Sequence, residues 1–225
     1  PDAVNAHNNR GLIDFEKQNY DEAVASFTKC IMIDPNTPKY YEHRRLAYLK
    51  LGMKTEAAED ARKWKQLQQH QVVNQQIVRQ PANAIGYIAR AELAFRDERY
   101  QQALVDFDRA VQLNSNLVQA WYGRAKTRFA MEEYQLAIED CSQVLKIKPL
   151  QPAYSLRGDA YMKLDKIDLA IEDFHAAKRL DPTVAEAFLK KAEELDSLGQ
   201  SDAAEEYRKK AQKLFPDLKL TPNAN

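Results

Sequence analysis

Residues 157–182 read RGDAYMKLDKIDLAIEDFHAAKRLDP. Apolar residues recur in this stretch at spacings of three and four, first at Tyr161, Leu164 and Ile167, then at Ala170, Ile171, Phe174, Ala177 and Leu180. This spacing places each run along one face of a helix. Asp181-Pro182 ends the second run, because proline disfavours helical geometry in the residue before it. The stretch therefore predicts a helical hairpin with Leu180 on the apolar face of its second helix.

The chain contains this hairpin pattern six times. One alanine in each second helix marks the period, at Ala23, Ala57, Ala103, Ala137, Ala170 and Ala204, with steps of 34, 46, 34, 33 and 34 residues. A second column, mostly proline, has a similar period: Pro35, Pro81, Ser115, Pro149, Pro182 and Pro216. A third holds small residues, Gly11, Ala91, Ala125, Gly158 and Ala192. Such a period indicates a stack of repeats, because one hairpin cannot bury its apolar face alone.

The period predicts an all-α solenoid of six antiparallel helix-turn-helix repeats. We expect the repeats to span residues 4–37, 38–71, 84–117, 118–150, 151–184 and 185–218, followed by a disordered tail, 219–225. The last repeat is hydrophilic, with Glu193, Glu194, Lys209 and Lys210, as a capping repeat needs.

Residues 72–83 are additional to the period, and lengthen one step by 12 residues. Leu67, Val72, Val73, Ile77 and Val78 keep a roughly helical spacing, and no Gly or Pro precedes Pro81. We therefore expect a lengthened second helix in repeat two, where the stack is jointed. A glutamine-rich loop is the alternative.

These repeats resemble the tetratricopeptide repeat family. One copy matches its pattern at Trp121, Ala125, Tyr134 and Ala137, a second at Gly11, Tyr20, Ala23, Phe27 and Pro35, and a third at Tyr154, Gly158, Tyr161, Ala170, Phe174, Ala177 and Pro182. The resemblance covers about residues 4–218. It implies a right-handed superhelix whose first helices line a concave side, where peptides of other proteins bind.

Carried over column by column, the resemblance places a peptide-binding groove on the first helices of repeats three to five. Its candidate residues are Phe95, Arg96, Tyr122, Lys126, Phe129, Met162 and Lys163. Aromatic side chains flanked by cations suit an extended peptide with an apolar anchor and an acidic group. The alternative is that some of these aromatics pack between helices.

Four arginines each precede an aspartate by sixteen residues: Arg44 and Asp60, Arg90 and Asp106, Arg124 and Asp140, Arg157 and Asp173. Sixteen residues span about 24 Å along one helix, so the partners can meet only across the two helices of a hairpin. We expect structural ion pairs that fix how these helices pack. An arginine ladder for anionic ligands is the alternative. The first and last repeats lack the pair, because Arg10 would meet Ser26 and Lys191 would meet Tyr207.

Composition and motifs argue against several classes of function. Lys+Arg and Asp+Glu are both 33, so the net charge is zero, whereas nucleic acids and acidic membranes favour basic surfaces. No apolar run is long enough to span a membrane. The sequence contains no HExxH, no cysteine pair at metal spacing, no phosphate loop and no GxSxG, so we expect no enzyme activity, cofactor or metal. His7 and His43 alone would make a weak metal site. We expect Cys30 and Cys141 to be buried core residues.

The best-known ligand mode of the family, a clamp for the C-terminal carboxylates of heat-shock chaperones, fits this sequence poorly. The clamp needs Lys and Asn on a first helix, Asn on the next, and Lys and Arg on the third. The corresponding positions hold Asn8, Leu12, His43, Ile85 and Ala89 in one set, and Tyr122, Lys126, Leu156, Glu186 and Lys190 in the other.

We therefore expect a protein-interaction scaffold that binds a peptide segment or a protein subunit. One alternative is a self-assembling module that oligomerises through its end repeats or the long helix of repeat two. Another is the targeting domain of a larger enzyme. The chain begins PDAV without an initiator Met, which favours a fragment of a longer protein, and we expect a cytoplasmic location or the soluble part of an anchored protein.

Overall fold

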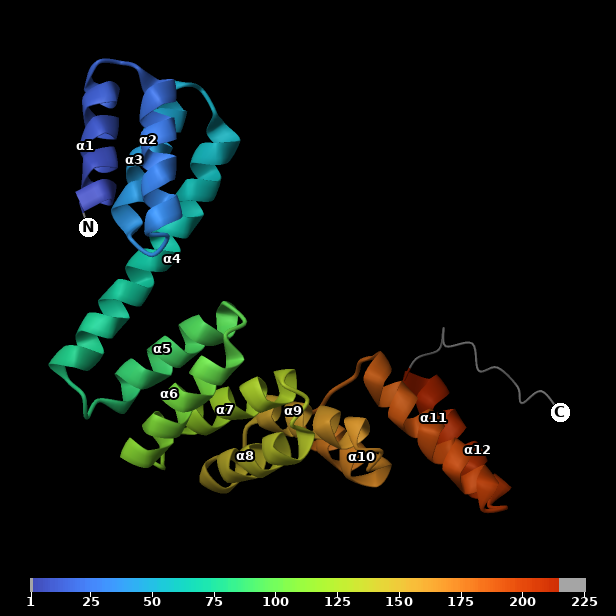
Figure 1. Cartoon of the computed structure of the whole chain (residues 1–225). Coiled ribbons are helices and arrows are strands. Elements are labelled where there is room, and N and C mark those ends of the chain that lie inside the picture. The colour runs from blue at the N-terminus through green and yellow to red at the C-terminus, as the bar shows by residue number, and fades with distance from the viewer. Residues whose placement is uncertain (1, 215–225) are drawn as a thin grey trace. The chain divides into compact units, whose positions relative to one another are not determined.

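The structure, a computed structural model, describes residues 2–214, which form twelve helices and contain no strand (Figure 1). The helices are α1 (Asp2–Glu16), α2 (Tyr20–Ile33), α3 (Pro38–Lys50), α4 (Lys54–Arg79), α5 (Ala84–Arg96), α6 (Tyr100–Leu113), α7 (Val118–Ala130), α8 (Tyr134–Ile147), α9 (Gln151–Lys163), α10 (Ile167–Ala176), α11 (Pro182–Ser197) and α12 (Ser201–Leu214). The prediction of an all-α fold is confirmed. The expected tail, 219–225, lies outside the described residues.

The helices belong to two compact units that divide between Pro81 and Ala82. In the first unit each helix packs on the next from α1 to α4, and the two first helices α1 and α3 also contact each other. In the second unit the same order runs from α5 to α12, with further contacts between α5 and α7 and between α7 and α9. Hairpins thus stack in sequence order within each unit.

Each hairpin turns through a single residue in the left-handed conformation. These residues are Gln18, Gly52, Glu98, Glu132, Asp165 and Gly199, with φ between 56° and 75°. The amide N–H of the following residue donates to a carbonyl five residues back, over 2.8–2.9 Å. This Schellman geometry satisfies helix-end carbonyls. It gives all six hairpins the same short turn, although only two carry the glycine that this conformation favours.

Small residues allow the two helices of a hairpin to approach closely. A Cβ added at Gly158 would lie 2.6 Å from Cε1 of Phe174 on α10. Gly11 has the same relation to Phe27 on α2, also at 2.6 Å. Both rings are fully buried. The glycines of the small-residue column are therefore required by packing against a large ring on the partner helix.

The additional residues of repeat two are helical. Helix α4 runs without interruption for 26 residues, from Lys54 to Arg79, and in Figure 1 it extends well beyond α1–α3. The prediction of a lengthened helix is confirmed to Arg79, and the glutamine-rich loop is wrong. Along the extension Val72 and Val78 are 54% and 82% exposed.

The second helix of repeat five differs from the prediction. Helix α10 ends at Ala176, four residues before Leu180, and Lys178 has a left-handed φ of 52°. Leu180, expected on the buried face, is 70% exposed. The expectation failed because the chain leaves the helix before Leu180, which therefore lies in the segment that leads to α11.

The expected burial of the two cysteines is confirmed. Cys30 and Cys141 are free and completely buried. In the last hairpin Ala204 and Ala211 are buried, whereas Glu193, Glu194, Lys209 and Lys210 are exposed. That hairpin thus has one apolar face and one charged face.

Candidate functional site

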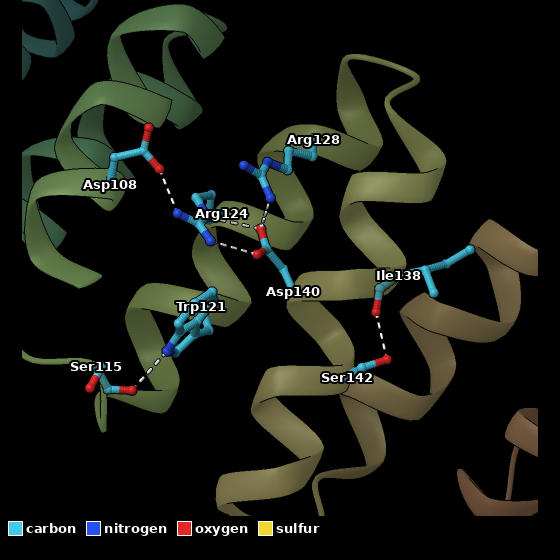
Figure 2. Close-up of polar contacts among 8 residues, drawn as sticks. All are labelled: Asp108, Ser115, Trp121, Arg124, Arg128, Ile138, Asp140 and Ser142. Carbon is cyan, nitrogen blue, oxygen red and sulfur yellow. Dashed lines mark hydrogen bonds and ion pairs between the residues drawn. The ribbon is translucent and has the colours of Figure 1, made fainter. Parts of the chain in front are cut away.

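The arginine and aspartate columns meet across each of the four hairpins. In the central case, Arg124 on α7 donates from Nη2 and Nε to the two oxygens of Asp140 on α8, over 2.7 and 3.0 Å (Figure 2). The Asp140 side chain is 2% exposed and the Arg124 side chain 12%. Arg128 adds a third hydrogen bond to Asp140, over 2.8 Å. Asp140 is therefore a buried carboxylate held by two guanidinium groups.

The remaining three pairs repeat this bidentate arrangement. Their N···O distances lie between 2.7 and 2.8 Å for Arg44 and Asp60, Arg90 and Asp106, and Arg157 and Asp173. The hydrogen bond to the aspartate, acting against burial, raises the pKa of each of these arginines. Bidentate pairing fixes the orientation of both groups, so it specifies the relative position of the two helices.

Three of these arginines also bond to the preceding hairpin, which the sequence analysis missed. Nη1 of Arg124 lies 2.6 Å from Oδ1 of Asp108 on α6 (Figure 2). The same atom of Arg44 donates to Thr28 Oγ1, and that of Arg157 to Ser142 Oγ, each over 3.0 Å. The signal was present, because an oxygen-bearing side chain stands fifteen or sixteen residues before each arginine. Each guanidinium therefore connects three helices in two successive hairpins.

Aromatic side chains three residues before the arginines complete this arrangement. The guanidinium of Arg124 lies 4.6 Å from the Trp121 ring centroid, and Trp121 Nε1 donates to the Ser115 carbonyl over 2.8 Å (Figure 2). Tyr41 stands in the same relation to Arg44, and its hydroxyl donates to the Pro35 carbonyl over 3.0 Å. The aromatic ring thus links the arginine to the loop between repeats.

The first and last repeats lack the pair, as expected. Arg10 instead lies 3.7 Å from Asp14 on its own helix, and its side chain is mostly exposed. Lys191 contacts Asp168 and Glu194 at 2.8 and 3.0 Å. Neither contact reproduces the buried bidentate geometry.

The candidate peptide-binding residues lie on α5, α7 and α9. Lys126 is central among them, because its ammonium lies 5.3 Å from the Phe95 ring centroid and 5.5 Å from that of Tyr122. Contacts at this range are attractive cation–π interactions. Among the described residues no carboxylate pairs with Lys126. A cation held by aromatic rings alone retains its capacity to bind an anion.

The other candidate peptide-binding residues differ in how exposed their side chains are. Arg96 and Lys163 are exposed, and Tyr122, Phe95 and Phe129 are half-buried. Phe95 packs on Tyr100 and Phe129 on Tyr134, with centroids 5.5 and 5.4 Å apart. Burial raises the pKa of Tyr122, with a smaller contribution from Cys141 in the same direction.

Met162 does not belong to this exposed set. It is 9% exposed and packs in a core cluster with Ile167, Phe174 and Val184. Although it shares a column with Phe95 and Phe129, the helices α10 and α11 cover it. Its inclusion among the groove residues is therefore corrected, and it belongs to the core.

Metal-binding clusters and membrane-spanning helices are both absent from the part of the chain that the structure describes. Within residues 2–214, no group of three or more His, Cys, Asp or Glu side chains could hold a metal ion. His43 Nδ1 lies 3.1 Å from Asn8 Oδ1. The ring nitrogen that faces α1 therefore already has a hydrogen-bond partner. No described helix is both long and apolar enough to cross a bilayer.

Comparisons with known proteins agree with the repeat architecture. The tetratricopeptide repeat family matches residues 4–37, 118–149, 151–184 and 185–218. Human serine/threonine-protein phosphatase 5 is 36% identical over 34% of this chain and 15% of its own length. Human tetratricopeptide repeat protein 13 is 30% identical over 72% of the chain and 18% of its own length. The Hsp70-Hsp90 organising protein of Plasmodium falciparum is 26% identical over 58% and 26%.

These relatives are much longer than the region that they share with the chain, which spans about a quarter of their length or less. Among solved structures, MamA has a TM-score of 0.44 and 25% identity, and covers 81% of this chain and 96% of its own. YrrB has a TM-score of 0.48 and 19% identity, and covers 85% and 93%. On its repeat pattern, its helical hairpins and these family matches, the chain belongs to the tetratricopeptide repeat family.

Proposed function

We propose that this chain is a non-catalytic scaffold that binds a peptide segment of another protein. The binding surface is formed by Phe95, Arg96, Tyr122, Lys126, Phe129 and Lys163, which we call the first-helix surface. One observation carries the proposal: the ammonium of Lys126 lies over two aromatic rings, from α5 and α7, without a carboxylate partner among residues 2–214.

The chemistry of this surface favours a particular class of peptide. Half-buried aromatic faces bind an apolar side chain by removing its surface from water. Lys126, with the exposed cations Arg96 and Lys163, attracts a carboxylate. We therefore expect an extended segment with one aromatic or aliphatic anchor beside an acidic side chain.

The relatives support a role in protein interaction by their names alone. Two of them are Hsp70-Hsp90 organising proteins, from Plasmodium falciparum and Arabidopsis thaliana. The match to phosphatase 5 covers 15% of that protein, so it carries no argument that this chain is an enzyme.

A displayed peptide library tests the proposal. We expect the wild type to enrich peptides that combine an aromatic residue with acidic residues. Tyr122→Ala combined with Lys126→Ala should lose this enrichment, whereas the control Lys146→Ala, at an exposed position of α8, should retain it. Equal enrichment by all three proteins would remove the first-helix surface as the binding site.

A second candidate function is self-assembly through the end repeats or α4. It is favoured by the exposed Val72 and Val78 on the extension of α4. Multi-angle light scattering over a range of concentrations separates the two functions, because only self-assembly predicts a mass that rises with concentration. Val72→Ser with Val78→Ser should then abolish the rise.

A further inference from the structure

The segment between α10 and α11 has an unusual geometry that brings Arg179 onto α9. The second helices α2, α6 and α8 each have 14 residues, whereas α10 has 10. The backbone leaves the helix through Lys178, whose φ is 52°. Arg179 therefore lies outside the helix, in the segment before Pro182.

Arg179 makes contacts with three successive helices or their caps. Its Nη1 donates to Oγ of Ser155 over 3.1 Å and to Oδ1 of Asp159 over 2.5 Å, both on α9. Its Nε pairs with Asp181, the N-cap of α11. Its guanidinium lies 4.7 Å from the Phe174 ring centroid. At 18% exposure, this is a guanidinium bound by two carboxylates, a hydroxyl and an aromatic face.

Two of the residues that bind Arg179 are the repeat equivalents of residues in the first-helix surface. Ser155 and Asp159 follow Tyr122 and Lys126 by 33 residues, the step between repeats four and five. They are therefore the equivalents on α9 of two residues of the first-helix surface, and α7 packs directly on α9. Where repeat four presents the cation Lys126, repeat five presents the carboxylate of Asp159, which pairs with Arg179.

We propose that Ser155, Asp159, Asp181 and Phe174 form a guanidinium-binding site that Arg179 occupies as an internal ligand, and that this contact makes the first-helix surface selective for acidic peptides. The second half of the proposal rests on the proposed function. Without Arg179, the carboxylate of Asp159 would keep only Lys163, four residues along α9, as a nearby cation, and its charge would repel an acidic ligand. Burial raises the pKa of Asp159 and Arg179 opposes this, so the ion pair helps to keep the carboxylate ionised.

The selectivity is tested with two fluorescein-labelled peptides of equal length, each with one tryptophan and with either several glutamates or several lysines. Arg179→Ala should weaken binding of the acidic peptide about fivefold, as expected for one unbalanced charge at short range in a partly solvated site. Arg179→Ala with Asp159→Asn should restore binding, because the carboxylate charge is also removed. Lys178→Ala is the matched control, since it removes an exposed neighbouring cation.

The outcomes separate the two proposals. If the acidic peptide fails to bind the wild type, the proposed function fails. If it binds the wild type and Arg179→Ala equally, or if the double variant stays as weak as Arg179→Ala, the selectivity role of Arg179 is refuted.

The binding site itself is tested without any peptide. Arg179→Gly should lower the melting temperature, and millimolar ethylguanidinium should recover part of the loss. Ethylammonium, a compact cation without the planar donor fork, should recover less. Asp159→Asn in the Arg179→Gly background should reduce the recovery, because only the second carboxylate, Asp181, then remains to bind the added cation. An Arg179→Gly protein that responds equally to both cations would overturn the guanidinium site.

Discussion

Removal of Asp140 is the sharpest test of how the arginine column stabilises the stack. Asp140→Ala deletes the acceptor of three hydrogen bonds, two from Arg124 and one from Arg128. Arg124 keeps Asp108, whose side chain is 47% exposed, but Arg128 loses the only ion pair that it makes among residues 2–214. Both guanidinium groups are largely buried, so the variant leaves charge without compensation inside the protein.

The magnitude follows from that loss. Breaking a buried pair by removing one partner typically costs about 3–5 kcal/mol. For a chain of this size each kcal/mol lowers the melting temperature by about 2–4 °C. The matched control is Glu139→Ala, the exposed neighbour on α8, for which we expect a change within about 0.5 kcal/mol.

Urea unfolding, followed by circular dichroism at the helix band, measures the free energy of unfolding of both variants. Arg124→Met alone and combined with Asp140→Ala completes a double-mutant cycle, in which the coupling should be favourable. If Asp140→Ala and Glu139→Ala destabilise the protein equally, the pair does not fix the hairpin and the reasoning is refuted.

Further predictions concern packing, turns, pH and thiol reactivity. Gly158→Ala should destabilise the protein by about 1–3 kcal/mol, because the added methyl overlaps the buried ring on α10; unchanged urea midpoints would contradict this packing. Glu132→Gly should stabilise it by about 1 kcal/mol, because Glu132 has a φ of 62° that glycine adopts without strain; Glu139→Gly on the adjacent helix should do the opposite. Burial lowers the pKa of His43. The charge of Glu42 raises this pKa and the charge of Lys39 lowers it, both by less than burial does. The unfolded chain then binds the proton more tightly, so stability should fall as the pH drops through the ordinary histidine range, and His43→Gln should reduce that dependence when melting is followed between neutral and mildly acidic pH. Burial raises the pKa of Cys141 to about 12, so Ellman's reagent should label neither cysteine of the folded protein at pH 8, and rapid labelling without denaturant would show that the core is open.

The repeat pattern predicted the fold well because helical hairpins are local structures. Ala23 and its five equivalents are 0–3% exposed where their burial is described, since a small residue at that position is needed wherever two helices approach. The pairing of Arg124 with Asp140 was equally predictable, because the same spacing in four copies reflects the same geometry in those four copies. The extension of α4 followed from apolar spacing and from the lack of Gly and Pro before Pro81.

The contacts between hairpins were less predictable. Phe95, Phe129 and Met162 occupy equivalent positions of three repeats, but their surroundings differ. The exposure of Met162 therefore depended on how α10 and α11 pack around it. The early end of α10 carries no proline or glycine signal at Ala176 or Ala177. The repeat period therefore could not predict that Arg179 contacts α9.

The amino-acid sequence by itself determined the order of the hairpins and the ion-pair partners within four of them, because these depend on spacings along one or two adjacent helices. Only the tertiary structure decided which oxygen of the preceding hairpin three of the arginines reach, that Met162 is buried, and that Arg179 pairs with Asp159. These contacts join residues whose distance depends on the packing of three helices at once, and small shifts in that packing change which side chains meet without changing the repeat pattern.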